Sequence, residues 1–465
     1  MSPRRRLNSG KDTLFSLVVT FVALLPRLFV AIAWAREPVW DGHYYHFGAE
    51  RLARGLGYSE DVFSHGHLVW KPWTHYPVGY SALLSLAYRV FGSELVVAPV
   101  VNAIIGALLA LVVHRFARYY LSRDRARIAA ALVALHPGLI AYSAVVMTEP
   151  LAALLLLCAG LAALHYRGHQ QGLIVAGALL GLATLVRPSS LLAGPLILFT
   201  QPRPYWQAAL RAAAATAMAL LVVLPWTLRN CARMDGCALV STNGGWNLAI
   251  GALTETGRFQ TLRAKDGCAV VTGQVQQDDC WARVGRAKIL SDPKHWLSLA
   301  PLKLAQTFDH ESFAIEYLHE ADPGRWSEDR RVAARELLTA FHRAILLLSA
   351  FGVAAWPLSL LTDKKALYAQ ASLLVVLTGL SALALFSDAH PFYLLAALPP
   401  IAAMLKLPGR PTQGAAGCYL LGLVIITVLM HVLFFGEDRY HLVVTPIFCI
   451  LAAGALRRPD EAPAT

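Results

Sequence analysis

The sequence predicts an all-α polytopic membrane protein that crosses the bilayer about twelve times. Of its 465 residues, 56% are hydrophobic and 15% are charged, whereas a soluble protein carries about a quarter charged residues. Apolar runs of about 18 residues or more recur along nearly the whole chain, which is the length that a helix needs to span a bilayer. We therefore expect residues 1–465 to form a single integral membrane domain.

The first expected span, residues 13–34, should remain in the chain because it is too long for a signal peptide and lacks a small-residue cleavage site. The apolar runs give these expected spans: 13–34, 95–117, 127–146, 150–167, 172–186, 188–200, 208–226, 340–361, 367–386, 391–405, 415–435 and 441–456.

The net charge of +12 follows membrane topology and does not predict nucleic-acid binding. Basic residues gather before the first span, in other short connections and at the end of the chain: Arg4, Arg5, Arg6, Lys11, Arg115, Arg118, Arg123, Arg125, Arg127, Arg203, Arg211, Lys364, Lys365, Lys406, Arg410, Arg457 and Arg458. Assigning them to the cytoplasm satisfies the positive-inside rule. Both termini are then cytoplasmic, and the long segments 35–93 and 227–339 lie outside.

Four of the seven cysteines lie in the second outer segment, where disulfides persist. Four cysteines allow three pairings, and we expect nearest-neighbour closure: Cys231 with Cys237, and Cys268 with Cys280. Four free thiols in a cytoplasmic loop are the alternative. Three further cysteines lie in apolar spans and are expected to be small core residues: Cys158, Cys418 and Cys449.

The outer segments show helical periodicity of their own. Residues 42–57 and 78–91 place apolar side chains on one face and polar ones on the other, as in helices that lie in the membrane interface. The second outer segment contains a Gly/Asn-rich turn at 241–251 and an expected helix at 279–307. It could serve as a lid or as a platform for an acceptor.

Two acidic residues stand at the expected outer surface. Asp41 follows the first span, where it could cap a helix or act as a general base whose basicity is raised by partial burial. Glu149 precedes Pro150 at a helix start, a position that the helix dipole favours for an acid. Two carboxylates on different hairpins could also converge on an acceptor or a metal ion.

Three cations, Lys71, Arg187 and Arg439, are expected outside, against the general charge bias. Any one of them could extend to the interface along its apolar stem. Together they predict an anion at the outer face, and phosphate is the obvious candidate.

Histidines crowd the first outer segment at positions 43, 46, 65, 67 and 75. Paired histidines can bind zinc, but no tight ligand signature is present, so hydrogen bonding to a lipid phosphate or a sugar is the favoured interpretation and metal dependence stays open. The chain has no Walker loop and no dinucleotide glycine fingerprint. We therefore expect a donor that is not a nucleotide.

Short motifs follow one another in order at the outer ends of the spans: WDGHYY, AERLARG, KPWTHYPVGY, MTEPLA, TLVRPS, LPWTLRN, STNGGWNLAIG and FFGEDRYHLVVTPI. In this order and placement the chain resembles the GT-C glycosyltransferases that use polyprenyl-phosphate sugars, which include protein O-mannosyltransferases and lipid A aminoarabinose transferases. The resemblance implies a GT-C-type helical bundle.

The resemblance also implies residue roles. Asp41 matches the catalytic carboxylate of the first loop, Lys71 the lysine that holds the donor phosphate, and Glu149 a second-loop acid. Many relatives have Asp-Glu where this chain has Asp41-Gly42, and some have Glu where it has Trp70, which weakens the case for a metal site. Further candidates for the substrate cavity are His43, Tyr44, His75, Tyr76, Asn243, Asn247 and Tyr440.

We therefore expect an inverting glycosyltransferase that moves a hexosyl or pentosyl group from a polyprenyl-phosphate donor to an acceptor glycan, lipid or protein. Its partners would be the bilayer, the donor lipid and that acceptor, without nucleic acid. The expected location is a bacterial inner (plasma) membrane with the active site facing the periplasm or outside. The alternatives are a transporter or flippase for lipid-linked sugars, and an inactive scaffold of an envelope synthesis complex.

Overall fold

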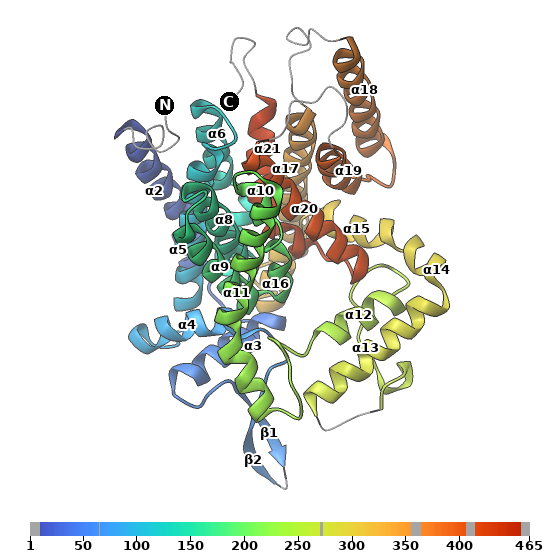
Figure 1. The fold of residues 1–465 in the computed structure, drawn as a ribbon. Helices are drawn as coiled ribbons and strands as arrows, with labels where there is room; N and C mark the ends of the chain where they lie inside the picture. Colours follow the sequence, from blue (N-terminus) through green and yellow to red (C-terminus); the bar gives the residue numbers. More distant parts are fainter. Residues whose placement is uncertain (1–9, 65, 270–272, 355–363, 406–413, 457–465) are drawn as a thin grey trace.

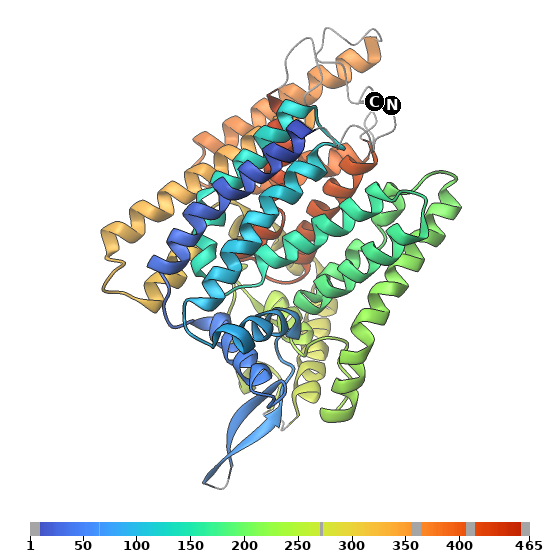
Figure 2. The ribbon, with the colours of Figure 1, turned by 90° about the vertical axis from the view of Figure 1, so that its left-hand side faces the viewer.

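The computed structural model describes residues 10–64, 66–269, 273–354, 364–405 and 414–456. Within them the chain is mostly helical and contains one antiparallel pair of strands. The start of α2 and the end of α21 lie at one end of the bundle, and the strand pair, α3 and α4 lie at the other (Figures 1 and 2). The expected cytoplasmic cations Arg4, Arg5, Arg6, Lys406, Arg410, Arg457 and Arg458 lie outside the described residues.

Six described helices are long and apolar enough to cross a membrane: α2 (Gly10–Ala33), α5 (Val97–Ala117), α11 (Tyr205–Arg233), α17 (Glu328–Ala354), α18 (Lys364–Phe386) and α20 (Ala415–Leu433). The count is seven if α6 (Arg123–Leu135) and α7 (Pro137–Ala141) with the 3-10 turn η1 (Tyr142–Ala144) form one bent span. Five apolar helices are shorter: α4 (Val78–Phe91), α8 (Glu149–His165), α9 (Gln170–Val186), α19 (Tyr393–Met404) and α21 (Thr445–Ala455). The chain is an integral membrane protein, and the expected number of about twelve spans is not confirmed within the described residues.

Proline breaks two of the expected spans. The helix expected over 127–146 bends by 49° between α6 and α7, where Pro137 has no N–H to continue the hydrogen-bond ladder. The regular helix expected over 188–200 is wrong. The chain there forms the 3-10 helix η2 (Pro188–Ala193) and the single turn α10 (Ile197–Thr200), because Pro188 and Pro195 cannot donate backbone hydrogen bonds.

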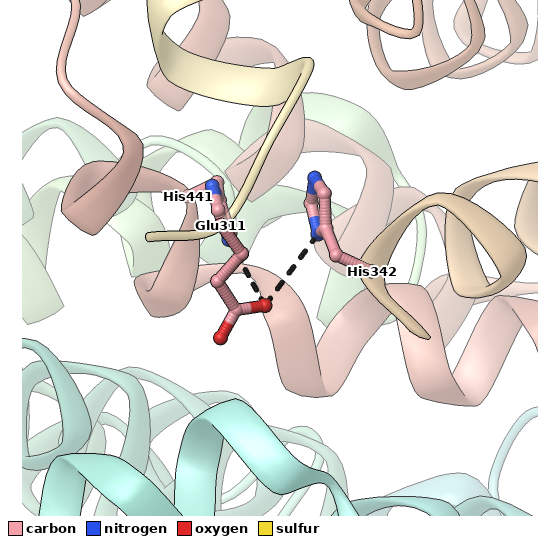
Figure 3. A group of neighbouring side chains, drawn as sticks. All are labelled: Glu311, His342 and His441. Atoms are coloured by element: carbon pink, nitrogen blue, oxygen red, sulfur yellow. Dashed lines mark ion pairs between the residues drawn. The ribbon is translucent and has the colours of Figure 1, made fainter. Parts of the chain in front are cut away.

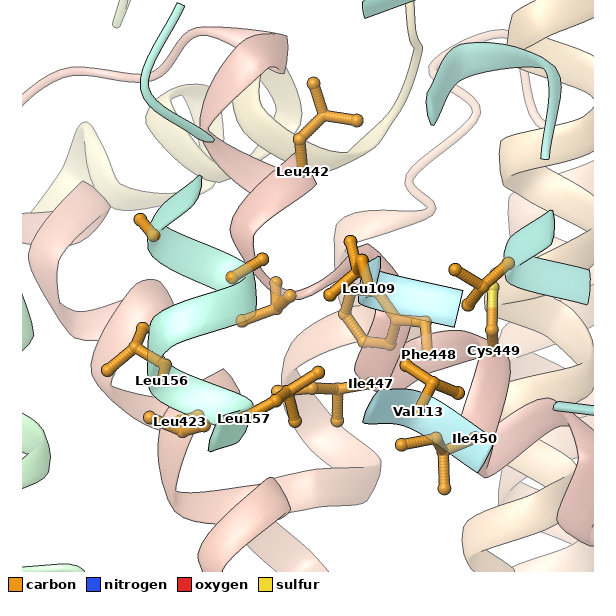
Figure 4. Close-up of a cluster of buried hydrophobic side chains, with 14 of the residues drawn as sticks. Leu109, Val113, Leu156, Leu157, Leu423, Leu442, Ile447, Phe448, Cys449 and Ile450 are labelled. Carbon is orange, nitrogen blue, oxygen red and sulfur yellow. The ribbon is translucent and has the colours of Figure 1, made fainter. Parts of the chain in front are cut away.

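The core of the bundle is apolar and closely packed. Leu109 and Val113 of α5 meet Leu157 of α8 and Ile447 of α21 in one buried cluster (Figure 4). Small residues bring helices together, since a Cβ at Gly352 of α17 would lie 1.8 Å from the carbonyl oxygen of Leu451 in α21. Such backbone contact is typical of helix packing in membranes, where burying apolar surface from lipid yields little.

The first outer segment contains both expected helices, α3 (Trp40–Ala53) and α4. Between them lies a hairpin that the sequence analysis did not anticipate, formed by β1 (Ser59–Ser64) and β2 (His67–Pro72). Val62 pairs with Val69, and Glu60 pairs with Lys71. The hairpin projects from the bundle at the end opposite to the start of α2 (Figure 1).

The second outer segment forms a smaller helical unit beside the bundle. The expected long helix 279–307 is divided by prolines: α13 (Gln274–Ser291), α14 (Pro293–Ser298) and α15 (Ala300–Phe308). The unit also contains α12 (Gly244–Leu253) and the 3-10 turn η3 (Ala264–Asp266). The helix α16 (Phe313–Ala321) packs instead in the bundle, where Ile315 and Leu318 share a buried cluster with Val30 of α2 and Leu338 of α17.

Both expected disulfides are confirmed, Cys231–Cys237 and Cys268–Cys280. Of the cysteines expected in apolar spans, Cys449 is buried, and Cys158 and Cys418 are half-buried. Cys268 belongs to a small core with Trp281 and Phe435. The second disulfide therefore holds together the unit that packs against the end of α20.

Candidate active site

A cavity of about 400 Å³ lies where the outer segments meet the ends of the bundle helices. Its walls come from α3, the turn before α4, the start of α8, the turn after α9, α12, the end of α20 and the 3-10 helix η5 (Asp438–Val443). Several of these elements are distant in sequence. The cavity therefore exists only in the folded chain.

Asp41 is the second residue of α3, and its side chain points to the cavity instead of capping the helix. Val39 occupies the N-cap position without a side-chain hydrogen bond. The preceding Trp40 has a φ of 49°, a strained conformation for a bulky residue that its packing against Phe313 and Tyr317 supports. The helix-capping interpretation of Asp41 is therefore wrong.

Gly42 leaves no room for a side chain at its position. A Cβ at this position would lie 2.3 Å from the hydroxyl oxygen of Tyr317. A glutamate here would clash unless Tyr317 moved. The tyrosine occupies the space that a second carboxylate would need.

The carboxylate of Asp41 is held by two donors. The Tyr76 hydroxyl donates to Oδ1 at 2.7 Å, and Nη1 of Arg439 donates to Oδ2 at 2.6 Å. Burial raises the pKa of Asp41, but Arg439 and the Tyr76 hydrogen bond outweigh it, so the pKa lies below its ordinary value. Asp41 is therefore ionised at neutral pH.

Glu149 begins α8 and pairs with Arg187 in the turn after α9. Nη1 of Arg187 lies 2.7 Å from Oε1 of Glu149 and also donates to the hydroxyl of Thr148 at 3.2 Å. Glu149 is 1% exposed, and its Oε2 has no hydrogen-bond partner among the described residues. This oxygen can accept a hydrogen bond from a ligand.

Tyr440 joins the two ion pairs. The guanidinium carbon of Arg187 lies 5.2 Å from the centre of its ring, and that of Arg439 lies 5.0 Å from it. His431 of α20 stacks on the same ring with the centroids 4.4 Å apart. Two guanidiniums are thus gathered at one aromatic ring, an arrangement suited to an anion.

Arg439 has a second acidic partner in Glu437, whose Oε2 lies 2.5 Å from Nε. Burial raises the pKa of Glu437 to about 7, although Arg439 acts in the opposite direction. Arg439 therefore stands between two carboxylates that differ in acidity. Glu437 was not anticipated from the sequence, because the same turn also offered Asp438 as an acid.

Most of the expected site residues line this cavity: Asp41, Glu149, Arg187, Arg439, His75, Tyr76, Asn243, Asn247 and Tyr440. His75 also contacts Trp246, with the ring centroids 5.8 Å apart. Burial lowers the pKa of His75, and nearby Asp41 opposes that shift.

Three expected site residues lie outside the lining. Lys71 is exposed on β2, opposite Glu60, because the hairpin projects away from the bundle and leaves the first five residues of β2 exposed. His43 and Tyr44 are exposed on α3, since the helix presents Asp41 and Tyr45 to the cavity. Tyr44 still supports the site indirectly by stacking on Tyr76, with the centroids 5.3 Å apart.

Tyr45, Trp246 and His431 also line the cavity and were not among the expected residues. The helical pattern placed Tyr45 on the apolar face of α3, which turns out to be the face toward the bundle. His431 is a polar residue near the end of an otherwise apolar span, which is a signal that could have identified it.

The histidines of the first outer segment, whose role in metal binding the sequence left open, do not form a group of metal ligands within the described residues, from which His65 is absent. Among the described residues, one group of three metal-ligating side chains lies close enough together to bind a single ion: Glu311, His342 and His441. None of these three lines the cavity.

Residues 75–228 match the family model described as dolichyl-phosphate-mannose-protein mannosyltransferase. The matched region includes Glu149 and Arg187, and it confirms the family resemblance over this part of the chain. No curated protein sequence matches the chain.

Solved structures of two membrane glycosyltransferases are similar to the chain. One is the archaeal oligosaccharyltransferase AglB from Archaeoglobus fulgidus, in complex with an inhibitory peptide and a dolichol-phosphate, at 17% identity and a TM-score of 0.47, covering 96% of this chain and 50% of that one. The other is ArnT from Cupriavidus metallidurans bound to undecaprenyl phosphate, at 15% identity and a TM-score of 0.37, covering 94% of this chain and 78% of that one. The chain spans about half the length of AglB.

Proposed function

We propose that the protein is a membrane glycosyltransferase that moves a sugar from a polyprenyl-phosphate donor to an acceptor outside the cytoplasm. The observation that carries the proposal is the convergence of Asp41, Glu149, Arg187 and Arg439 on one cavity. Residues 75–228 match a family model whose description names dolichyl-phosphate-mannose as the sugar donor. Dolichyl phosphate is a polyprenyl phosphate.

Arg187 and Arg439 would bind the donor phosphate. A guanidinium offers paired N–H donors that match phosphate oxygens, and both arginines lie against Tyr440. A smaller cavity of about 40 Å³ shares Arg187 and Tyr440 with the main one and adds apolar side chains such as Leu423 and Ile426. An apolar cavity next to a phosphate site could bind the prenyl chain of the donor.

The proposed reaction is a direct displacement at the sugar C1 atom. The acceptor oxygen or nitrogen forms a bond to C1 while its proton passes to Asp41. The C1–O bond breaks, and its electron pair leaves on the phosphate, where the two arginines stabilise the negative charge. Attack from the side opposite the phosphate inverts the anomeric centre.

Donor binding would also prepare Asp41 as a base. In the structure Arg439 holds its pKa down, which makes the carboxylate a weak proton acceptor. A phosphate that attracts Arg439 would draw the guanidinium from Asp41, and the pKa of the carboxyl would rise. Burial alone raises the pKa of Asp41, but Arg439 outweighs burial, so the expectation that partial burial makes Asp41 more basic is wrong in this structure.

The disulfides support a cavity that faces outside the cytoplasm, because such bonds persist in oxidising compartments. Cys268–Cys280 lies in the same small core as Phe435, which lines the cavity. An inner or plasma membrane with cytoplasmic termini fits this arrangement.

A carrier for lipid-linked sugars would not need a base at the cavity wall, so loss of Asp41 separates the two functions. The experiment uses a strain in which the gene is deleted, and mass spectrometry of envelope lipids, glycans and proteins identifies the missing product. Purified protein is then assayed with membranes from that strain for release of polyprenyl phosphate.

Asp41→Asn should lower turnover by at least about a hundredfold, as expected for loss of a general base, while the purified variant still binds polyprenyl phosphate. The matched control is Asp279→Asn, a carboxylate exposed on α13 outside the cavity. Near-normal turnover of folded Asp41→Asn protein would overturn the assignment of Asp41. Absence of any sugar change in the deletion strain would overturn the proposed function.

A further inference from the structure

Glu311, His342 and His441 form a buried group, here called the His–Glu cluster, on the side of η5 away from the cavity. Each of these residues is at most 1% exposed. Oε2 of Glu311 lies 3.9 Å from Nδ1 of His342 and 3.7 Å from Nε2 of His441 (Figure 3). The two imidazole rings stack with their centroids 4.0 Å apart.

The remaining ring nitrogens are bound to backbone carbonyls. Nε2 of His342 lies 2.8 Å from the carbonyl oxygen of Phe308, and Nδ1 of His441 lies 2.7 Å from that of Thr307. A carbonyl oxygen can only accept a hydrogen bond, so both of these nitrogens carry a proton. In a neutral imidazole the other nitrogen then presents a lone pair, and in both residues that lone pair faces Glu311.

Two lone pairs directed at a carboxylate repel it unless something positive lies among them. Neither oxygen of Glu311 accepts a hydrogen bond within the described residues, and Nε2 of His441 also has no hydrogen-bond partner there. Unsatisfied buried polar atoms cost about 1–3 kcal/mol each. A bound cation or a proton could remove this cost.

We propose that the His–Glu cluster binds one divalent transition-metal ion of the zinc class. Two imidazole nitrogens and a carboxylate oxygen are a common donor set for zinc, and the three donor atoms lie within 4.8 Å of one another. Ligand atoms of a tetrahedral zinc site are about 3.4 Å apart. The oxygen–nitrogen distances of 3.7 and 3.9 Å need to shorten by a few tenths of an ångström, and the two stacked rings, whose centroids are 4.0 Å apart, need to splay around the ion.

The carbonyl contacts of the two histidines strengthen the proposal. Histidines that ligate a metal usually donate their other N–H to a carbonyl or carboxylate, which fixes the tautomer and aims the ligating nitrogen. Both histidines of the cluster have this arrangement. Gly138 of α7 adds to the fit, because a Cβ there would lie 1.4 Å from Oε1 of Glu311.

The ion would join three segments that are separate in the sequence. Glu311 lies between α15 and α16, His342 is in α17, and His441 is in η5 two residues after Arg439. Ligation of His441 would therefore hold the 3-10 helix that presents Arg439 to the cavity. In this arrangement the metal positions a cavity residue and does not contact the reacting atoms.

The test measures the metal content of the protein by inductively coupled plasma mass spectrometry. The protein is purified in detergent without chelator. Wild-type protein, reloaded with Zn²⁺ and dialysed, should hold about one ion per chain. Glu311→Gln and His342→Gln should each lower the affinity by more than about a hundredfold, since changes to outer-shell partners alone cost about 10–100-fold. His114→Gln, which removes a buried histidine that contacts Ser16, should keep the ion.

A second measurement uses the wild-type chain and so does not depend on whether a variant folds. Replacement of the ion with Co²⁺ should produce visible absorption bands of a low-symmetry nitrogen and oxygen site. Wild-type protein that takes up neither Zn²⁺ nor Co²⁺ would overturn the proposal. A proton on Glu311, whose pKa burial raises to about 7, would then neutralise the cluster.

Metal that stays bound to folded Glu311→Gln and His342→Gln protein would overturn the proposal as well, because the ion would then lie elsewhere. Because metal content is measured without turnover, the result is independent of the proposed sugar transfer.

Discussion

The acidic groups on the two sides of η5 have opposite kinds of neighbours. On the cavity side, Asp41 and Glu437 lie against the guanidinium of Arg439, and Glu149 lies against Arg187. On the other side, Glu311 has two imidazoles within 4 Å in the described part of the chain, both with lone pairs toward it. The first arrangement is an exchangeable set of ion pairs, and the second has a charge imbalance that needs an additional cation or proton.

The helix η5 therefore contributes residues to two different kinds of site, the cavity and the His–Glu cluster. Ion pairs at a cavity can be broken by an incoming anion, since the anion replaces the lost carboxylate. A buried carboxylate between neutral histidines has no such exchange and is better suited to a permanent ion. The comparison can be tested from either side.

The largest effect is expected for Arg439→Gln. This change removes the proposed phosphate contact and leaves Asp41 and Glu437 without their shared cation, which is costly for buried charges. Loss of one stabilising donor lowers turnover by about 10²–10³-fold, and we expect at least the upper value here, measured as release of polyprenyl phosphate.

Arg439→Lys is the matched control, because it keeps the charge but loses the paired N–H geometry. Its turnover should fall between wild type and Arg439→Gln. If Arg439→Gln works within about tenfold of wild type, the cavity-side pairs have no part in catalysis, and the contrast between the two sides of η5 loses its functional meaning.

Glu437 should make the free energy of unfolding depend on pH, and this effect is expected to be smaller than that of Arg439→Gln on turnover. Its folded-state pKa is raised from 4.5 to about 7, so the folded chain binds more protons than the unfolded chain between these values. The free energy of unfolding should therefore fall as the pH rises from about 4.5 to 7. The charged neighbours of Glu437 are Arg439, Asp41, Asp438 and Glu149.

The full shift would correspond to about 3 kcal/mol, but 28% of the Glu437 side chain is exposed, so we expect about 1 kcal/mol after screening by solvent. Thermal unfolding of wild type and Glu437→Gln at pH 5, 6 and 7 measures it. The wild-type Tm should fall more steeply with pH than that of the variant. Parallel slopes would show that Glu437 titrates normally.

The smallest effect is expected for Lys71→Ala. Lys71 is exposed on the hairpin, outside the cavity lining, and an exposed charge contributes at most about 1 kcal/mol. Donor turnover should stay within about fivefold of wild type. A loss of more than about a hundredfold would instead support the family-based role of Lys71 in holding the phosphate, and the hairpin would then have to reach the cavity during turnover.

Much of the site could be predicted from sequence because polar residues are scarce in this chain. Asp41, Glu149, Arg187 and Arg439 stood out as charged groups at the ends of apolar runs, and all four line the cavity. The disulfide pairing could be predicted from sequence proximity. Helix continuity was harder to predict, since the prolines at 137 and 188 divided segments whose hydropathy suggested single spans.

The sequence by itself determined the membrane class, the apolar helices, both disulfides and the charged residues of the cavity. The length and polarity of each segment are local properties, and they suffice to place polar groups at helix ends. Only the tertiary structure decided that Arg439 pairs with Asp41, that Lys71 lies outside the cavity, and that Glu311 meets two distant histidines. These contacts depend on lateral helix packing and on the direction of a hairpin, which are set by side-chain fit between segments far apart in the chain.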